Sequence, residues 1–276
     1  MTQFAIITGA AGGMGTAIAS LLGRTQELLL TDVNREKLNE LLEKLSDEGI
    51  QAQGLVGDLS DPHVAASLAE RCAGSGNIRS IVNAAGLSPA QADWHSIIRA
   101  NIIGPVQMLN VLEPLLGAGT ACVMIASVAG HLGPPDTEIE RLLDNPLQSD
   151  LYGLLEPKLT ALVAAQGGTM EGHAYSFSKR AILRLCETRA LDWGDKKARI
   201  VSLSPGVVAT PMGQKEAESG NRAQALVDAT PAGRWGTAAD IAAAVEFLLS
   251  NEAGYITGSD IRVDGGAVAA MRGKAF

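Results

Sequence analysis

Tyr175 and Lys179, four residues apart in the segment YSFSK, are the side chains of this sequence best suited to acid–base chemistry. Positions i and i+4 lie on the same face of a helix, so both side chains can reach one pocket. A free phenol has a pKa of about 10. A nearby ammonium favours the phenolate and lowers that pKa. The pair therefore indicates a general base, although a tyrosine and a lysine at this spacing also occur together by chance.

Ser127 and Asn101 are two further polar residues at positions that suggest function. Ser127 ends the apolar run ACVMIAS, and the carboxyl end of a parallel strand faces the ligand crevice. Its hydroxyl can donate to a substrate oxygen that gains negative charge, or it can cap a turn. Asn101 lies in the middle of a predicted helix at 92–116, where asparagine is unfavourable. Such an asparagine indicates a bent helix or a bound water.

A glycine-rich loop, TGAAGGMG at 8–15, follows the first predicted strand and leads into a helix that begins near Gly13. Glycines let backbone N–H groups approach a pyrophosphate, and the helix N-terminus favours its negative charge. The spacing differs from the GxGxxG fingerprint, so a purely steric role of these glycines stays open. The predicted phosphate-binding residues are Gly9, Gly12, Gly13, Met14 and Gly15.

Asp32 ends the second predicted strand, 17 residues after Gly15. An acidic side chain there can bind both hydroxyls of the adenosine ribose, and it would repel a 2′-phosphate. Arg35 and Lys37 follow closely, but they are typical of the first turn of an exposed helix. We therefore expect NAD rather than NADP as the cofactor. A helix N-cap or a turn residue is the alternative interpretation of Asp32.

Short apolar runs alternate with longer amphipathic segments along the chain. This alternation predicts an α/β fold, a doubly wound (Rossmann) parallel sheet of about seven strands in a single domain over 1–276. The predicted strands are Phe4–Thr8, Leu28–Thr31, Ala52–Val56, Ser80–Asn83, Ala121–Ser127, Arg199–Ser204 and Ile261–Val263. The predicted helices lie near 13–23, 35–48, 62–73, 92–116, 175–193 and 238–249.

Two stretches interrupt this rhythm. Residues 130–172 separate a strand from a helix where two to six residues are usual, and they carry leucines at the spacing of one helical face, Leu151, Leu154, Leu155, Leu159 and Leu162. We expect a helical insertion here, with one short and one longer helix. Residues 211–237 are rich in glycine, alanine and charge. They predict a helix near 214–228 within a lid over the substrate.

The composition limits the classes of function. The chain of 276 residues carries a net charge of −8, which argues against a nucleic-acid surface. No apolar run approaches the length of a membrane span, and the first strand begins too early to leave room for a targeting peptide. We expect a soluble, cytoplasmic protein. Cys72, Cys122 and Cys186 are too far apart for a zinc site and are odd in number for disulfides.

The four histidines carry little signal, and no ligand-spaced cluster predicts a metal. His63 and His95 are expected on exposed helix faces. His131 and His173 flank the insertion, and either can line the substrate pocket, but a solvated loop histidine is the favoured interpretation of both.

Taken in order, these motifs resemble the short-chain dehydrogenase/reductase family, in its short-subunit branch. The resemblance covers nearly the whole chain and rests on Thr8–Gly15 (TGxxxGxG), Asp58-Leu59, Asn83-Ala84-Ala85-Gly86, Asn101, Ser127, Tyr175–Lys179 (YxxxK), Ser204-Pro205-Gly206 and Val263-Asp264-Gly265-Gly266. It implies an NAD-dependent enzyme that moves a hydride between the nicotinamide and a secondary alcohol or ketone.

The resemblance also implies roles for individual residues. Tyr175 would be the acid/base, Lys179 would lower its pKa and hold the nicotinamide ribose, Ser127 would bind the reacting oxygen, and Asn101 would hold a relay water. The implied cofactor contacts outside the glycine-rich loop and Asp32 are Asp58, Leu59, Asn83, Ala84, Gly86, Tyr175, Lys179, Pro205, Gly206, Val208 and Thr210.

One departure from the family pattern is that Tyr175 follows Ser127 by 48 residues, where about a dozen are usual. Some relatives that act on steroids and other ring alcohols carry an insertion there, which makes such substrates a reasonable expectation. Two other classes of protein are alternatives to a dehydrogenase. A regulatory protein that binds NAD without catalysis would lack the Tyr or the Lys, and a sugar epimerase or dehydratase of the longer branch would have other glycine spacing.

The resemblance also implies how subunits would associate. Relatives often pair the helices around Asn101 and Tyr175 in a four-helix bundle and use the last helix and strand for a second contact. We expect the insertion to cover the bundle surface. The contact through 238–249 and 260–266, with its small residues Ala242, Ala243 and Val245, would then give a dimer rather than a tetramer.

Overall fold

Seven parallel strands form one sheet in the order β3-β2-β1-β4-β5-β6-β7. The computed structural model describes residues 3–75, 77–218, 226–228 and 230–273. The strands are β1 (Gln3–Thr8), β2 (Glu27–Asp32), β3 (Ala52–Val56), β4 (Asn77–Asn83), β5 (Ala121–Ile125), β6 (Arg199–Pro205) and β7 (Asp260–Val263). The order reverses between β1 and β4, where open α/β sheets bind ligands. The predicted doubly wound α/β fold is confirmed.

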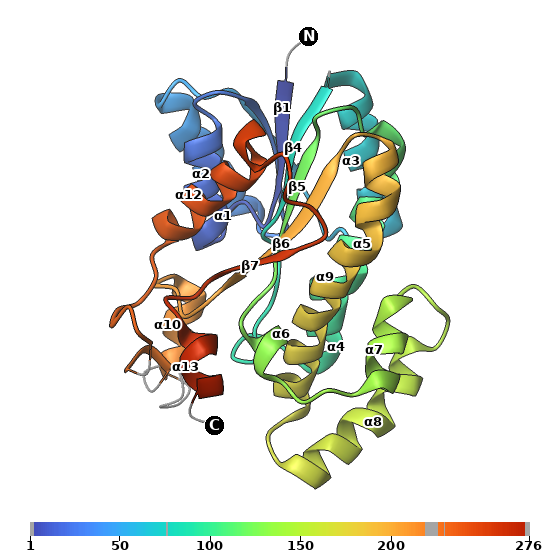
Figure 1. The fold of residues 1–276 in the computed structure, drawn as a ribbon. Coiled ribbons are helices and arrows are strands. Elements are labelled where there is room, and N and C mark those ends of the chain that lie inside the picture. The colour runs from blue at the N-terminus through green and yellow to red at the C-terminus, as the bar shows by residue number, and fades with distance from the viewer. Residues whose placement is uncertain (1–2, 76, 219–225, 229, 274–276) are drawn as a thin grey trace.

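Helices cover both faces of the sheet (Figure 1). One face packs against α1 (Gly13–Leu22), α2 (Arg35–Asp47) and α12 (Ala238–Leu249), and the other against α3 (Pro62–Ser75), α5 (Gly104–Leu112) and α9 (Met170–Asp195). Because both faces are covered, β1, β5 and β6 are buried almost throughout, as their continuous apolar runs predict. A 3₁₀ turn, Asn251–Ala253, and helix α13, Ala267–Gly273, flank β7.

The predicted helix at 92–116 is wrong as one continuous element. It consists of α4 (Trp94–Ile98), a π-helical segment (Arg99–Ile103), α5 and a 3₁₀ turn (Glu113–Leu115). Pro105 lies two residues after the end of the π-helical segment and has no N–H to continue a regular ladder. π-helical turns are short and concentrate at functional sites. The bend expected from Asn101 is therefore present, and it takes the form of this turn.

Helix α9 begins five residues earlier than predicted. The Thr169 hydroxyl accepts a hydrogen bond from the Gly172 N–H and caps the helix, which then runs from Met170 to Asp195. Tyr175 consequently lies in the second turn of α9 and not at its start. In the 211–237 stretch, α10 spans Pro211–Glu218. Residues 219–225 lie outside the described part of the chain, so the predicted helix near 214–228 can be compared only at its two ends.

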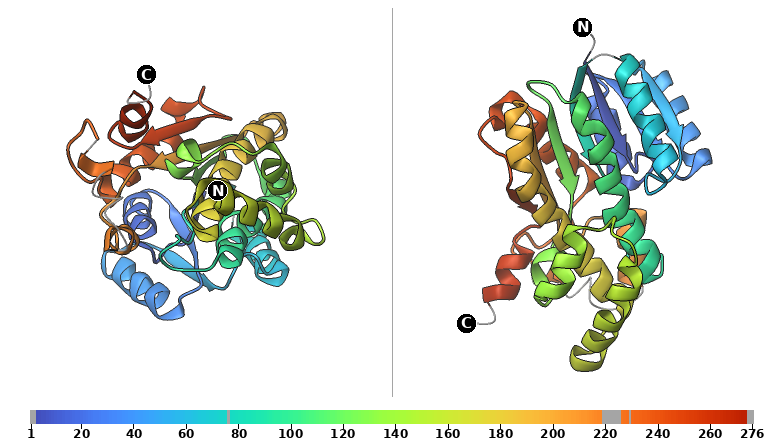
Figure 2. Two further views of the ribbon diagram at one scale, coloured as in Figure 1. Left: turned by 90° about the horizontal axis from the view of Figure 1, so that it is seen from below. Right: turned by 90° about the vertical axis from the view of Figure 1, so that its right-hand side faces the viewer.

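Residues 130–172 contain α7 (Thr137–Asp144) and α8 (Leu151–Gln166), and the single turn α6 (Ala129–Leu132) begins just before them. Both α7 and α8 pack against α9. The leucines of α8 are buried against it with one exception: Leu154 is 41% exposed and does not belong to the predicted face. Figure 2 shows α8 protruding at the end of the molecule opposite the start of β1. The insertion thus lies beyond the carboxyl ends of the strands.

Within the described residues, no helix is both long enough and apolar enough to cross a membrane.

Candidate active site

The glycine-rich loop joins β1 to α1 at the switch point of the sheet. Gly9 has a φ of +61°, and a Cβ there would lie 2.6 Å from the backbone of Ala85. A Cβ on Gly15 would lie 2.2 Å from the Gly9 carbonyl oxygen. Both positions therefore require glycine for steric reasons. The steric role is compatible with a binding role, because the first N–H groups of a helix have no intrahelical partner and can receive a phosphate.

Thr210 and Gly13 bring the 211–237 stretch to this loop. A Cβ on Gly13 would lie 2.9 Å from the Thr210 side chain, and the Thr210 hydroxyl accepts from the Gly213 N–H at 3.2 Å. Val208, two residues earlier, is buried and forms a bridge to Gly236. Residues 208–210 therefore lie across the start of α1, where a dinucleotide bound to the loop would meet them.

Asp32 does not cap helix α2. That position belongs to Asn34, whose side chain accepts from the Lys37 N–H. The Asp32 carboxylate instead accepts from Ala11 N–H of the glycine-rich loop at 3.0 Å and from Asn34 N–H at 2.9 Å. The N-cap interpretation of Asp32 is therefore wrong. The carboxylate stands beside the phosphate loop, where the ribose of a bound dinucleotide would lie.

Asp58 and Arg99 form an ion pair at the other side of the predicted adenosine site, with 3.3 Å between Oδ2 and a guanidinium nitrogen. The other Asp58 oxygen accepts from the Ser60 N–H. Leu59 is buried in the core. Asn83 is buried as well and accepts from the Thr8 hydroxyl at 2.8 Å, which ties the ends of β4 and β1 together. Arg99 was missed in the sequence, where only its closeness to Asn101 pointed to it.

Three predicted site residues meet around Gly86. A Cβ on Gly86 would lie 3.2 Å from both Asn101 Oδ1 and Lys179 Nζ. Lys179 is buried, its ammonium donates to the Ile125 carbonyl at 3.1 Å, and its Nζ lies 5.9 Å from the centroid of the Tyr175 ring. The structure thus brings the Tyr–Lys pair, Asn101 and the end of β5 to one place.

Asn101 is held by the backbone on one side and by a hydroxyl on the other. Its Oδ1 accepts from Leu87 N–H at 2.7 Å, and its Nδ2 donates to the Leu87 carbonyl and to Ser178 Oγ. Ser178 in turn donates to the Tyr175 carbonyl. Ser178 was missed in the sequence analysis, although it lies inside the YSFSK segment that carries the Tyr–Lys pair.

Ser127 lies two residues beyond the end of β5, so the predicted strand Ala121–Ser127 is too long at this end. The backbone still follows β6, because Val128 N–H donates to the Pro205 carbonyl. Ser127 Oγ accepts from the Ala129 N–H at 3.2 Å. Gly206 approaches Asp264 closely, with an added Cβ 2.9 Å from its Cα. Ser127, Pro205 and Gly206 thus share the carboxyl edge of the sheet.

His131 does not match its interpretation as a solvated loop histidine. Its Nε2 lies 2.8 Å from Asp260 and 3.2 Å from Ser204 Oγ, and its side chain is largely buried. It is therefore an internal partner of β6 and β7 rather than a solvated loop residue. His63 and His95 are exposed, as predicted. His173 lies inside α9 and is half-buried, so it is not a solvated loop residue either; its Nε2 lies 2.8 Å from the Gly167 carbonyl oxygen.

The three cysteines are free and buried. Burial raises the pKa of the Cys72 thiol to about 12, and it raises the pKa values of Cys122 and Cys186 as well. Such thiols are poor nucleophiles and poor metal ligands near neutral pH. Among the described residues, no group of three or more His, Cys, Asp or Glu side chains is placed to hold a metal ion.

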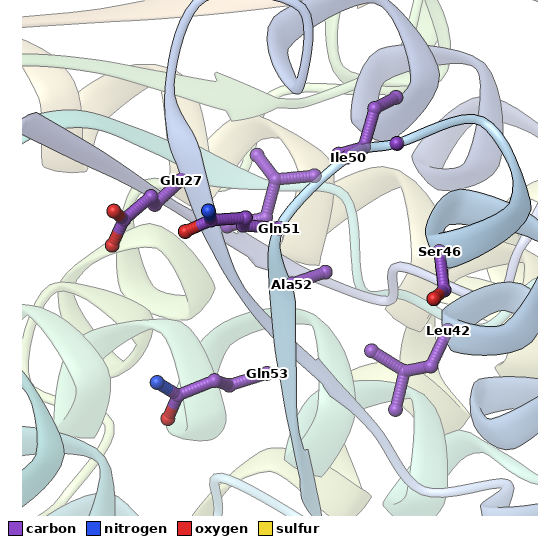
Figure 3. Close-up of a pocket in the computed structure, with 9 residues that line it drawn as sticks. Glu27, Leu42, Ser46, Ile50, Gln51, Ala52 and Gln53 are labelled. Carbon is purple, nitrogen blue, oxygen red and sulfur yellow. The ribbon is translucent and has the colours of Figure 1, made fainter.

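A surface hollow lies elsewhere, at the start of β2 and β3 (Figure 3). Glu27, Leu42, Ile50 and Gln53 are among the residues that border it. Glu27 and Ala52 begin their strands, so this hollow opens at the amino ends of the sheet, whereas ligands of such folds bind at the carboxyl ends. It is not part of the candidate active site.

Two family models match most of this chain. A family model described as "short chain dehydrogenase" matches residues 3–138, and one described as "Enoyl-(Acyl carrier protein) reductase" matches residues 159–268. The unmatched residues 139–158 fall inside the 130–172 stretch. The chain is 32% identical over 273 residues to Short-chain dehydrogenase/reductase bsc3 of Alternaria brassicicola, covering 98% of this chain and 97% of that one.

Two further relatives have names that state a substrate. The chain is 30% identical to D-threitol dehydrogenase of Mycolicibacterium smegmatis (96% of this chain, 92% of that one). It is 29% identical to cyclopentanol dehydrogenase of a Comamonas species (96% of both chains). The chain belongs to the short-chain dehydrogenase/reductase family. It is an oxidoreductase enzyme of that family, whose members use NAD or NADP.

Proposed function

We propose that this enzyme transfers a hydride between NAD(H) and a secondary alcohol or its ketone, with Tyr175, Lys179, Ser127 and Asn101 as its catalytic residues. The observation that carries the proposal is the convergence at Gly86, where Asn101 Oδ1 and Lys179 Nζ would both lie 3.2 Å from an added Cβ. A small residue there leaves room for a ligand between the relay asparagine and the lysine. The Tyr175 ring lies next to that lysine.

Bound NAD would supply the hydride acceptor, and the protein would supply the proton chemistry. Tyr175 takes the proton of the substrate hydroxyl during alcohol oxidation and returns it during ketone reduction. The nearby Lys179 ammonium favours the phenolate form that this requires. Because Lys179 is buried and already donates to the Ile125 carbonyl, its charge is fixed in position before a substrate binds.

Ser127 and Asn101 would serve the two ends of the proton path. The Ser127 hydroxyl stands at the carboxyl edge of the sheet and would donate to the substrate oxygen. Asn101 occupies a π-helical turn, where the i→i−4 ladder of the helix is interrupted. Backbone groups released there, together with the Asn101 amide, would hold a water that passes the proton from the lysine to solvent.

The choice of NAD over NADP rests on Asp32. Two backbone N–H groups hold its carboxylate beside the glycine-rich loop. A 2′-phosphate carries negative charge and would meet this carboxylate, whereas two ribose hydroxyls would donate to it. The glycine-rich loop fits a dinucleotide because an added Cβ on Gly12, the N-cap of α1, would meet only the Gly9 carbonyl oxygen at 3.2 Å, so the lack of a side chain keeps this helix start open to a pyrophosphate. Residues 208–210 and α10 would close over it as a lid.

A ring alcohol is the substrate class we propose, because the chain carries an insertion beside the site and resembles a cyclopentanol dehydrogenase. Because the chain is also similar to a D-threitol dehydrogenase, acyclic polyols are the substrates against which ring alcohols must be tested. We further propose a cytoplasmic location, since the three thiols are unpaired.

A homodimer through α12 and β7 remains our proposal for the assembly, with one correction. Ala242 and Val245 are buried inside the subunit, so they are unavailable for the contact. Ala239, Ala243 and Phe247 are the exposed apolar residues of that helix. α7 and α8 pack on α9, so they cover part of the surface that a four-helix bundle would use.

A panel assay tests the proposed reaction. The protein is mixed with NADH or NADPH and with cyclic ketones, acyclic ketones and steroid ketones, and the loss of cofactor absorbance is followed. The reverse reaction uses NAD with cyclopentanol and D-threitol. NADH oxidation with a cyclic ketone is expected. NAD binding without turnover of any member of a broad panel would instead favour a regulatory protein.

A further inference from the structure

Arg180 follows Lys179 directly on α9, and its guanidinium is the meeting point of three segments. It donates to the carbonyls of Gly130 (3.0 Å), Gly133 and Pro134 (2.7 Å). It also forms an ion pair with Glu140 of α7 at 3.2 Å. Its side chain is only 16% exposed. A single buried cation therefore ties the catalytic helix to the backbone that follows Ser127 and to the insertion.

The backbone bonded by Arg180 is the segment that leads away from Ser127, which we call the α6 segment (residues 128–134). It lies flat on α9, because a Cβ on Gly130 would be 2.9 Å from Arg180 N and 3.0 Å from the Lys179 carbonyl carbon. A Cβ on Gly133 would be 2.8 Å from the Ser176 Cβ. The α6 segment therefore touches α9 at the residues next to Tyr175 and Lys179. Ser127 directly precedes this segment.

Arg184, one turn further along α9, offers a natural contrast. It makes a two-pronged ion pair with Asp144 at 2.8 and 2.6 Å and reaches Glu140 at 3.7 Å. Both arginines thus bind the insertion helix α7. The side-chain ion pairs of Arg184 are with α7, whereas three of the four hydrogen bonds of the Arg180 guanidinium are with the α6 segment. Figure 1 shows α6 and α7 on either side of the lower half of α9.

We infer that Arg180 is a positioning residue, which fixes Ser127 against Tyr175 and Lys179 by holding the carbonyls of the α6 segment. The inference rests on the proposed function, since it assumes that these three residues act together. A guanidinium suits this task because it has five donors in a rigid plane and no acceptor, so it can bind several carbonyls at once. A lysine ammonium at the same place is a point charge and cannot hold the same set.

The test compares Arg180→Met with Arg184→Met, because both variants lose bonds to α7 and only the first loses the bonds to the α6 segment. Two readouts are needed. Hydrogen exchange of the peptides covering 126–135 needs no substrate, and kcat and KM are measured with the best alcohol of the panel. NAD affinity and Tm are recorded for both variants, and Arg180→Lys is included in case the methionine variant does not fold.

Arg180→Met should speed exchange across 126–135 and lower kcat by about 10²-fold, the scale of a 1 Å misplacement of a reacting group. kcat/KM should fall equally, because the lost interaction is felt in the transition state. NAD affinity should be unchanged, and Arg180→Lys should lie between. Arg184→Met should lower Tm with near wild-type kcat and unchanged exchange in 126–135.

Equal effects of the two methionine variants would overturn the inference, because anchoring of the insertion would then explain both. Wild-type exchange and kcat in Arg180→Met would overturn it as well. Tyr175→Phe, assayed in parallel, separates the two proposals. If it keeps the wild-type rate, the proposed catalytic function fails. If it is inactive while Arg180→Met is fully active, only the role of Arg180 fails.

Discussion

The side-chain amide of Asn101 donates to the hydroxyl of Ser178 at 3.1 Å, and this bond joins the π-helical turn to α9. Both side chains are buried. The Ser178 hydroxyl in turn donates to the Tyr175 carbonyl at 2.8 Å. The segment that carries the proposed relay and the helix that carries the proposed base are therefore linked inside the protein. Their relative position is set before any ligand binds.

Tyr175→Phe should abolish turnover and leave NAD binding nearly intact. The phenol acts on the substrate, and general acid–base catalysis contributes about 10²–10⁴-fold. Steady-state rates and a cofactor titration by fluorescence quenching measure the two effects. Lys179→Met is the companion variant and should weaken both rate and cofactor binding. A Tyr175→Phe enzyme with more than about a tenth of the wild-type rate would show that another group is the base.

Asp32→Asn should raise the use of NADP relative to NAD, because it removes the charge and keeps a side-chain acceptor. Asp32→Ala should do the same but also loosen the glycine-rich loop, since the acceptor for Ala11 N–H disappears. The kcat/KM values for the two cofactors in each variant separate the effect of the Asp32 charge from the effect of its hydrogen bond to the glycine-rich loop. Equal use of NAD and NADP by the unmodified enzyme would mean that the carboxylate does not face the ribose.

Phe247→Asp should convert the proposed dimer to a monomer. Phe247 is 50% exposed on α12, and a charge placed in an apolar contact is costly to bury. Leu191→Asp is the matched control, because Leu191 is an 80% exposed leucine on α9, the helix that the bundle contact would use. Light scattering gives the mass of each. Dissociation by Leu191→Asp alone would place the contact on the bundle instead.

The three thiols should resist alkylation in the folded protein. Their raised pKa values mean that almost no thiolate forms at pH 8, and burial excludes the reagent. Reaction with iodoacetamide, counted by mass spectrometry, should label all three only in denaturant. Rapid labelling of one thiol under native conditions would reveal local opening around that residue.

Asp240→Asn should destabilise the fold at pH 7 by about 0.5–1 kcal/mol, because Asp240 completes the capping box of α12 and pairs with the exposed Arg234. The Arg234 side chain and the Thr237 N–H and hydroxyl hold the pKa of Asp240 below its usual range. A lowered carboxyl pKa adds stability above the unfolded value of about 3.9 and loses it as the pH falls further. The Tm difference between the two proteins should therefore shrink below about pH 4. A difference that grows on acidification would contradict this assignment.

The sheet could be predicted from the sequence because buried parallel strands leave an unmistakable apolar run. The strands β5 and β6 begin at the predicted residues, and their parallel pairing follows from the alternation with helices. Their ends are harder to place, as Ser127 shows. It continues the apolar run ACVMIAS, yet ladder pairing between β5 and β6 ends at Ile125, and the chain then turns into α6.

The parts that could not be predicted depend on contacts between distant segments. The burial of His131 requires Asp260, which lies 129 residues away. The role of Arg180 requires carbonyls of the α6 segment, and carbonyls have no sequence signature. One signal was available: Glu140 and Asp144 share the i, i+4 spacing of Arg180 and Arg184. That matching pattern could have placed α7 against α9.

The insertion leaves the body of the protein close to where it returns. Gly133 lies against Ser176, and α9 begins at Met170, only about 9 Å away along the helix at 1.5 Å per residue. Three extended residues could bridge such a gap. An insertion at this junction therefore leaves the strands of the sheet in place. The same junction is a suitable place to shorten the segment or to exchange it for that of a relative with another substrate.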